Sequence, residues 1–254
     1  MTFRRIPWGT DFPDVILHAT VALRDAHPDY AAAKAGEREP AVRLACALLS
    51  GAAVARIGEV LGDQRPILVP VRAVETTGIN LIPDAMAHEP GQRLGLPVTS
   101  EIVQTNTVGH TRASGFHRLA FQPIFAGGVL PGGRYLLIDD HVGLGGTLAN
   151  LRGHIESNGG LVILTTTLSA SRQSEVLALR PETLQSLREK HGELLEQYWQ
   201  AHFGFGLEAL TEAEAGYLLR TPSLDAIRDR MAEAGGSGVP GAIQPDQGDR
   251  PPRG

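Results

Sequence analysis

Two adjacent carboxylates and a glycine-rich loop stand close together near the middle of the chain. Residues 135–138 form a predicted buried strand that leads Asp139 and Asp140 into the loop from Gly143 to Thr147. Glycines let a backbone turn tightly and aim successive N–H groups at one point, a geometry that binds phosphate. A helix predicted over residues 147–157 adds the positive end of its dipole. Because two carboxylates would repel a phosphate, we expect them to bind sugar hydroxyls or a Mg²⁺ ion.

This arrangement resembles the signature of the type I phosphoribosyltransferases: an apolar strand, two acidic residues, and a short Thr/Gly-rich loop that ends in Thr. In that family the acidic pair holds the ribose hydroxyls of phosphoribosyl pyrophosphate (PRPP), and the loop holds its 5′-phosphate. The resemblance implies that PRPP contacts Asp139, Asp140, Gly143, Leu144, Gly145, Gly146 and Thr147. Gly143 and Leu144 depart from the family, which often has Thr, Ala or Asp and then Thr. Gly143 also lacks the acid that lies near the base in the purine-salvage branch.

Two other glycine-rich nucleotide-binding motifs do not fit the loop. A dinucleotide-binding fingerprint needs a third glycine where Leu148 stands, and a Walker-type loop needs a lysine after the glycines. An ordinary strand-to-helix turn with capping aspartates stays open as an alternative. The nine histidines show no spacing typical of zinc ligands, and no serine has the context of a nucleophile elbow. We therefore predict no dedicated metal site and no hydrolase triad, and we favour a structural hydrogen bond for His141.

Composition limits the classes of protein that fit. The 254 residues, 42% hydrophobic and 20% charged, suffice for one α/β domain with additions or for two small domains. A formal net charge of −5 at pH 7 argues against general binding to nucleic acids or membrane surfaces. The single cysteine, Cys46, excludes an intrachain disulfide. Since we find no signal peptide and no apolar stretch of membrane-spanning length, we expect a cytoplasmic protein.

Helices are predicted near both ends of the chain and strands between them. The helices cover residues 14–27, 40–61, 84–88, 147–157 and 181–203, and two further pieces begin at a Thr211 capping box and at Thr221-Pro222. The strands cover residues 67–71, 98–103, 135–138 and 161–168. Strands that alternate with helices predict an α/β fold with a mainly parallel sheet. The chain is thus divided into an N-terminal helical extension (1–62), an α/β core (63–172), a C-terminal helical region (173–234) and a disordered tail (235–254).

Cations are expected around the pyrophosphate of PRPP. The resemblance implies that the loop after the first core strand receives pyrophosphate, and Arg72 stands at its start; the alternative is a surface arginine. The polar stretch 104–118 lies where the family carries a mobile lid, which makes Arg112, His117 and Arg118 candidates to neutralise the leaving group; the alternative is a solvated hairpin. Val69-Pro70-Val71 and Gly78-Ile79-Asn80 are also similar to elements of the ComF branch, although its zinc-binding cysteines are missing.

The resemblance implies an enzyme that transfers ribose 5-phosphate from PRPP to a nitrogenous base and releases pyrophosphate, with Mg²⁺ bound alongside PRPP. Asp139, Asp140, Arg112 and Arg118 are the expected catalytic residues, and Arg72 is expected to bind PRPP. The terminal helices would cover the base or form a homodimer interface. Two alternatives stay open: a non-catalytic PRPP or nucleotide-binding regulator on the same fold, and an interaction protein that binds no PRPP. The sequence does not identify the acceptor base or a general base.

Overall fold

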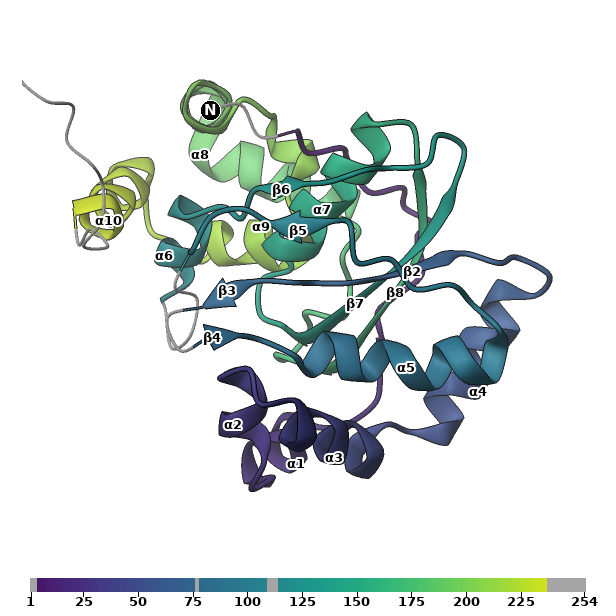
Figure 1. Ribbon diagram of the computed structural model, residues 1–254. Coiled ribbons are helices and arrows are strands. Elements are labelled where there is room, and N and C mark those ends of the chain that lie inside the picture. The colour runs from purple at the N-terminus through teal and green to yellow at the C-terminus, as the bar shows by residue number, and fades with distance from the viewer. Residues whose placement is uncertain (1–3, 76–77, 109–113, 237–254) are drawn as a thin grey trace, which may run out of the picture.

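The computed structural model describes residues 4–75, 78–108 and 114–236. Its centre is a sheet of strands β1 (Ile16–Leu17), β8 (Leu161–Ala170), β7 (Arg134–Val142) and β2 (Ile67–Pro70), in that order and all parallel to their neighbours. The long central strands β7 and β8 are buried on both faces, as parallel strands usually are. The sheet and the helices at both ends of the chain confirm the predicted α/β class (Figure 1).

Helices cover both faces of the sheet because side chains of β7 alternate between two apolar clusters. Leu136 and Ile138 pack with α3 (Arg38–Leu48), α4 (Gly51–Leu61) and α5 (Ile82–Leu94). Tyr135 and Leu137 pack on the opposite side with α7 (Gly146–Ser157). A third cluster joins α6 (Gly115–Ala120), α8 (Pro181–Phe203), α9 (Glu212–Leu219) and α10 (Leu224–Gly236). The C-terminal helices thus have an apolar core of their own beside the sheet.

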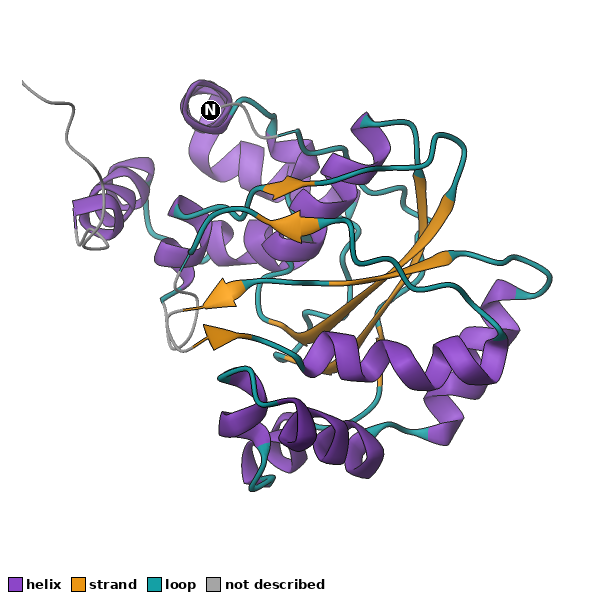
Figure 2. Ribbon diagram, viewed as in Figure 1, coloured by secondary structure: helices purple, strands orange, loops and turns teal. Residues whose placement is uncertain are grey.

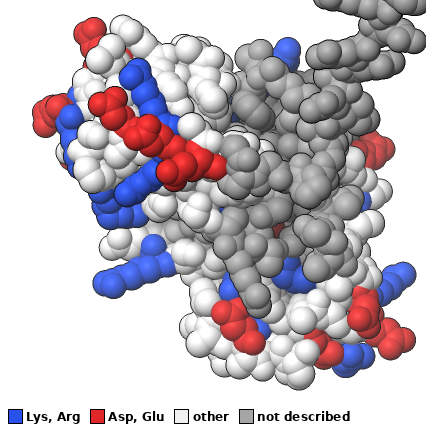
Figure 3. Space-filling view, turned by 90° about the vertical axis from the view of Figure 1, so that its left-hand side faces the viewer, with Lys and Arg blue, Asp and Glu red and all other residues white. Residues whose placement is uncertain are grey.

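Short elements complete the described chain. Two antiparallel pairs, β3 (Val74–Glu75) with β4 (Gly78–Ile79) and β5 (Val103–Gln104) with β6 (Phe125–Ala126), lie apart from the main sheet (Figure 2). The helices α1 (Val21–Ala26) and α2 (Tyr30–Lys34) and the 3-10 turn η1 (Leu207–Ala209) are the remaining elements of the described residues. On the surface shown in Figure 3, acidic and basic side chains stand close together in the upper part.

The structure corrects several predicted elements near the N-terminus. The predicted helix over 14–27 begins only at Val21, because Ile16 and Leu17 join the sheet edge as β1. Residues 1–62 are therefore not a purely helical extension. The predicted helix over 40–61 is two helices bent by 80°, because Ser50 is extended and caps α4 by accepting a hydrogen bond from the Ala53 N–H.

Other corrections concern short pieces. The helix α5 extends well past residues 84–88. The predicted strand 98–103 does not form: Val98 makes an isolated bridge with Leu68, and Val103 begins β5 and pairs with Ala126. The last helix is capped by Ser223, whose side chain accepts from the Ala226 N–H, and not by Thr221. Most of the predicted tail falls outside the described residues, and residues 235–236 end α10.

No single helix in the described part of the chain is long and apolar enough to span a membrane. The bent pair Arg38–Leu48 and Gly51–Leu61 passes that test jointly, by length and composition alone.

Candidate functional site

The acidic pair lies at the carboxyl end of β7. Asp139 and Asp140 belong to the strand itself, which continues to Val142 and not only to residue 138 as predicted. Both side chains are buried, with Asp139 7% and Asp140 5% exposed, and the Asp140 N–H donates to Asp139 Oδ1 at 2.8 Å. Because the strand is parallel to both neighbours, the pair opens toward the edge where ligands of open α/β sheets bind.

The two carboxylates differ in their electrostatic environment. Burial, and then the neighbouring Asp140, raise the pKa of Asp139 well above its usual value. Burial also acts to raise the pKa of Asp140, but the Lys34 ammonium, 3.1 Å from Asp140 Oδ2, outweighs it and holds the pKa below its usual value. Asp140 is therefore the stronger acid and the more anionic member of the pair. Lys34 reaches it from α2, a contact that the sequence analysis did not find.

His141 has the structural role predicted for it. Its ring nitrogens lie 3.0 Å from Ser169 Oγ and 3.1 Å from Ser171 Oγ, at the end of the neighbouring strand β8. Burial, and then the Arg24 charge, lower the pKa of His141 to about 4, so the ring is neutral near pH 7. The histidine thus joins the ends of two strands beside the acidic pair.

The loop from Gly143 to Thr147 opens α7 as predicted. Gly145 has a left-handed backbone (φ +85°) and is the N-cap, and Gly146 begins the helix. A Cβ on Gly145 would lie 2.9 Å from Leu177 Cδ2 and 3.0 Å from Thr211 Cγ2. Glycine is therefore required here both by the left-handed backbone and by the C-terminal region that packs behind the loop.

A small cavity of about 30 Å³ adjoins this loop. It is lined by Asp139, His141, Arg118, Glu214 and residues 142–148. The loop backbone and the N-terminus of α7 would favour an anion in this space. Glu214 is an unexpected wall of such a cavity, since a carboxylate opposes an anion.

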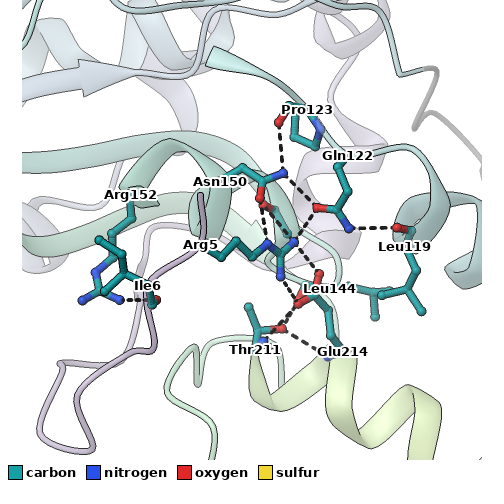
Figure 4. Close-up of polar contacts among 11 residues, drawn as sticks. Arg5, Ile6, Leu119, Gln122, Pro123, Leu144, Asn150, Arg152, Thr211 and Glu214 are labelled. Atoms are coloured by element: carbon teal, nitrogen blue, oxygen red, sulfur yellow. Dashed lines mark hydrogen bonds and ion pairs between the residues drawn. The ribbon is translucent and has the colours of Figure 1, made fainter. Parts of the chain in front are cut away.

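Buried hydrogen bonds explain how Glu214 is held there (Figure 4). The Arg5 guanidinium is paired with Glu214 through both of its terminal nitrogens, one at 2.9 Å from Oε1, and both side chains are buried. Arg5 also donates to Asn150 Oδ1 at 2.7 Å and to Gln122 Oε1 at 2.6 Å. Arg5 therefore neutralises Glu214 and ties the N-terminal segment to α7 and α9.

The predicted capping box at Thr211 is confirmed, and it contacts the loop. The Thr211 side chain accepts from the Glu214 N–H, the Glu214 carboxylate accepts from the Thr211 N–H, and the Thr211 hydroxyl donates to the Leu144 carbonyl. A single turn of α9 thus supports the loop from behind. The sequence showed the capping box but not its contact with the loop, which lies 67 positions away.

The predicted cations fall in three different places. Arg72 makes a two-pronged salt bridge with Asp84, with Nε 2.9 and 3.0 Å from the two carboxylate oxygens. Arg118 lies against the loop, since a Cβ on Gly143 would be 2.8 Å from its Nη1. His117 Nε2 lies 3.0 Å from the Val108 carbonyl. Arg112 is outside the described residues, so the structure brings only Arg118 to the loop.

A larger cavity of about 560 Å³ adjoins the same loop and is of a size that suits small-molecule ligands. Arg118, Gly143 and Leu144 line both cavities. The remaining wall comes from the segment after β8 and from α9, including Arg172, Gln173, Glu175, Arg180, Glu212, Tyr217 and Arg220. Gln173 has a left-handed backbone (φ +63°), which is uncommon for a residue other than glycine.

The fold and site define an α/β protein with a buried acidic pair, a glycine loop and a helix N-terminus at one sheet edge. No family model matches the chain. Protein TraN of Escherichia coli is 45% identical over 230 residues, 91% of this chain and 51% of its own length. An uncharacterized protein of Haemophilus influenzae is 40% identical over 152 residues, 59% of this chain and 34% of its own length. The chain therefore spans about half, or less, of the length of the curated relatives that it matches.

Similar solved structures include phosphoribosyltransferases. A crystal structure of adenine phosphoribosyltransferase matches with a TM-score of 0.35 and 12% identity, over 56% of this chain and 77% of its own. The UMP synthase of Leishmania donovani matches with a TM-score of 0.29 and 14% identity, over 76% of this chain and 35% of its own. Likeness at this level carries no argument about activity. Neither curated relative is named as a ComF protein, so the comparisons do not support the predicted similarity to the ComF branch.

Proposed function

We propose that this chain is a phosphoribosyltransferase that transfers ribose 5-phosphate from PRPP to a nitrogenous base and releases pyrophosphate. One observation carries the proposal. The buried pair Asp139 and Asp140 lies in the last four residues of a central parallel strand, β7, which leads into a loop in which Gly145 is left-handed and opens α7. Sites for sugar hydroxyls and for a phosphate are thus adjacent, as a phosphorylated ribose requires.

Each part of the site has a distinct task in this proposal. The more anionic Asp140 and its neighbour Asp139 accept hydrogen bonds from the ribose hydroxyls. The backbone of Gly143 to Thr147 and the α7 dipole hold the 5′-phosphate. The bond from ribose C1 to pyrophosphate breaks and its electron pair leaves with pyrophosphate. The acceptor nitrogen then bonds to C1 and loses its proton to water. Most of the catalytic effect would come from positioning and from stabilising charge.

Mg²⁺ fits this site only as an ion carried by PRPP. The described residues contain no group of three or more His, Cys, Asp or Glu side chains that could hold a metal ion. Mg²⁺ usually binds through one or two carboxylates and substrate phosphates, and Asp139 and Asp140 supply two carboxylates. When bound, the ion would neutralise charge on the diphosphate.

The cavity of about 560 Å³ is the proposed acceptor site, since it meets the loop at Gly143 and Leu144. Arg118 lies between this cavity and the smaller one, where a cation would contact charge that develops on the leaving group. Arg112 keeps the same proposed role, outside the described residues.

A second candidate is a non-catalytic regulator that binds PRPP or a nucleotide. The salt bridge between Arg72 and Asp84 favours it, because a cation expected to assist the leaving group is already paired. Both candidates require ligand binding at the acidic pair, and they differ in whether pyrophosphate is released.

Calorimetry with PRPP and Mg²⁺, followed by assays of pyrophosphate release with purine and pyrimidine bases, tests the proposal. Asp140→Asn should weaken PRPP binding about 10-fold or more, because a charge-assisted hydrogen bond is lost. Glu156→Gln is a matched control, since Glu156 is a largely buried carboxylate paired with Arg152 at 2.9 Å along α7. Tight PRPP binding without turnover would favour the regulator. No PRPP binding by the wild-type protein would refute both.

A further inference from the structure

The α1–α2 segment lies against the carboxyl ends of β7 and β8. Arg24 Nη1 donates to Ser169 Oγ at 2.9 Å, and Lys34 Nζ lies 3.1 Å from Asp140 Oδ2. The Tyr30 ring stands near both cations, 5.1 Å from the Arg24 guanidinium carbon and 6.0 Å from Lys34 Nζ. Lys34 is thereby placed beside the acidic pair, while Arg24 lies at the end of β8 and also pairs with Asp25.

The end of α2 also touches the segment that follows β2. The Leu81 N–H donates to the Ala33 carbonyl at 3.3 Å. A Cβ on Gly78 would lie only 2.1 Å from the Ala35 carbonyl oxygen, which shows how closely the two backbones approach. Lys34 stands between Ala33 and Ala35, so its backbone lies beside this segment while its side chain reaches Asp140.

This location joins two parts of the proposed ligand site. Asp140 belongs to the part that would hold the ribose hydroxyls. The segment after β2 is the part that would receive pyrophosphate, and Arg72 at its start is held by Asp84. Lysine presents three donors on a flexible four-carbon stem, so its ammonium can move several ångströms without any change in the backbone. The Lys34 side chain is 20% exposed and therefore only partly buried.

We propose that Lys34 is a further catalytic residue whose ammonium passes from Asp140 to the pyrophosphate group of PRPP when ligand binds. This inference rests on the proposed function. Ribose hydroxyls take the place of Lys34 on Asp140, and the released ammonium donates hydrogen bonds to pyrophosphate oxygens. Lys34 keeps its proton throughout. The electron pair of the broken C1–O bond stays on pyrophosphate, where the ammonium stabilises it.

Three ligands separate this role from others: PRPP with Mg²⁺, pyrophosphate with Mg²⁺, and ribose 5-phosphate. Lys34→Ala should weaken PRPP and pyrophosphate binding roughly 10- to 100-fold, the effect of one charged hydrogen bond. Ribose 5-phosphate has no pyrophosphate and should bind equally well or more tightly, because Lys34 no longer competes for Asp140. Lys34→Arg should restore much of the lost affinity, since it keeps the charge.

Arg43→Ala is the matched control. Arg43 also forms an ion pair within the N-terminal helices, at 2.6 Å from Asp29, but away from the acidic pair. It should change none of the three affinities. Melting temperatures of all variants, measured without ligand, show whether a loss of affinity follows a loss of structure.

Four results would overturn the proposal. Tighter binding of PRPP and ribose 5-phosphate alike in Lys34→Ala would mean that Lys34 only blocks Asp140. Equal weakening of all three ligands with a lowered melting temperature would mean that it only supports the fold. Unchanged affinities would remove Lys34 from the site while leaving the proposed function intact. Absence of PRPP binding in the wild-type protein would refute the proposed function itself and this inference with it.

Discussion

Removal of the Arg5 guanidinium should both destabilise the protein and weaken the proposed phosphate site. Arg5→Ala deletes the partner of Glu214, and the two side chains are 0% and 1% exposed. Breaking a buried ion pair by removing one partner costs roughly 3–5 kcal/mol, because an uncompensated charge is left behind. Asn150 and Gln122 lose donors as well. Since whole domains are stable by only about 5–15 kcal/mol, the loss should be large.

The same change bears on function because Glu214 lines the small cavity beside the loop. Without Arg5, its carboxylate would repel the 5′-phosphate. Binding of ribose 5-phosphate should therefore fall in Arg5→Ala. It should recover in Arg5→Ala with Glu214→Gln, because glutamine removes the charge and keeps an oxygen to accept from the Thr211 N–H. Recovery of binding in the double variant would show that the loss in Arg5→Ala comes from the uncompensated Glu214 charge and not from a general loss of structure.

Urea denaturation followed by tryptophan fluorescence measures the stability. Trp8 and Trp199 are both buried, Trp8 in the cluster beside α7 and Trp199 among the C-terminal helices, so the fluorescence reports on these two apolar clusters. Arg4→Ala is the control, because the neighbouring Arg4 is exposed. If Arg5→Ala unfolds at the same urea concentration as Arg4→Ala, the Arg5–Glu214 pair does not hold these elements together.

Three further predictions concern single side chains. Asp139→Asn should stabilise the protein at pH 7, because the pKa of Asp139 is raised in the folded state and stability is therefore lost as pH rises through that folded pKa. Asp140→Asn should destabilise the protein by roughly 1–3 kcal/mol, because the ion pair with Lys34 is lost. Thermal melts check both, since the melting temperature should rise in the first variant and fall in the second. Burial lowers the pKa of His18 to about 4. As pH falls from 6.5 to 4, the unfolded chain therefore binds a proton before the folded protein does, and the free energy of unfolding should fall by up to about 3 kcal/mol. His18→Gln should flatten that part of the pH–stability curve. Gly145→Ala should lower the melting temperature, whereas Gly143→Ala should be accepted once the Arg118 side chain shifts, and equal melting temperatures would contradict the packing described behind the loop.

The sequence predicted those features whose cause lies within one short segment. The predicted helix over 147–157 matches α7, and the capping box at Thr211 is present, because apolar periodicity and capping are local. The predicted helix over 181–203 has the bounds of α8, but α8 is kinked at Gly192, whose backbone is not helical (φ +70°). The edge strand β1 was missed because two residues are too short for a period of two to show. The break at Ser50 was missed because the apolar pattern continues on both sides of it.

The charged partners of the site could not be predicted in the same way. Lys34 meets Asp140 across 106 positions, and Arg5 meets Glu214 across 209. No period or spacing links such residues, since each pair depends on how α2 and α9 pack against the sheet. The salt bridge between Arg72 and Asp84 on α5 could not be predicted either, and the expected contact of Arg72 with PRPP stays a prediction.

Gly145 shows how one residue can fit a functional pattern for a structural reason. Its place in the loop fits a phosphate-binding turn, yet its Cβ direction leads to Leu177 and Thr211 behind the loop. The glycine is therefore explained by packing before any ligand is considered. Packing does not explain the burial of Asp139 beside Asp140 in this way, because burial and the neighbouring charge both oppose ionisation of Asp139. Folding alone would favour an apolar residue at that position, so the acidic pair, more than the glycines, is the feature that function must explain.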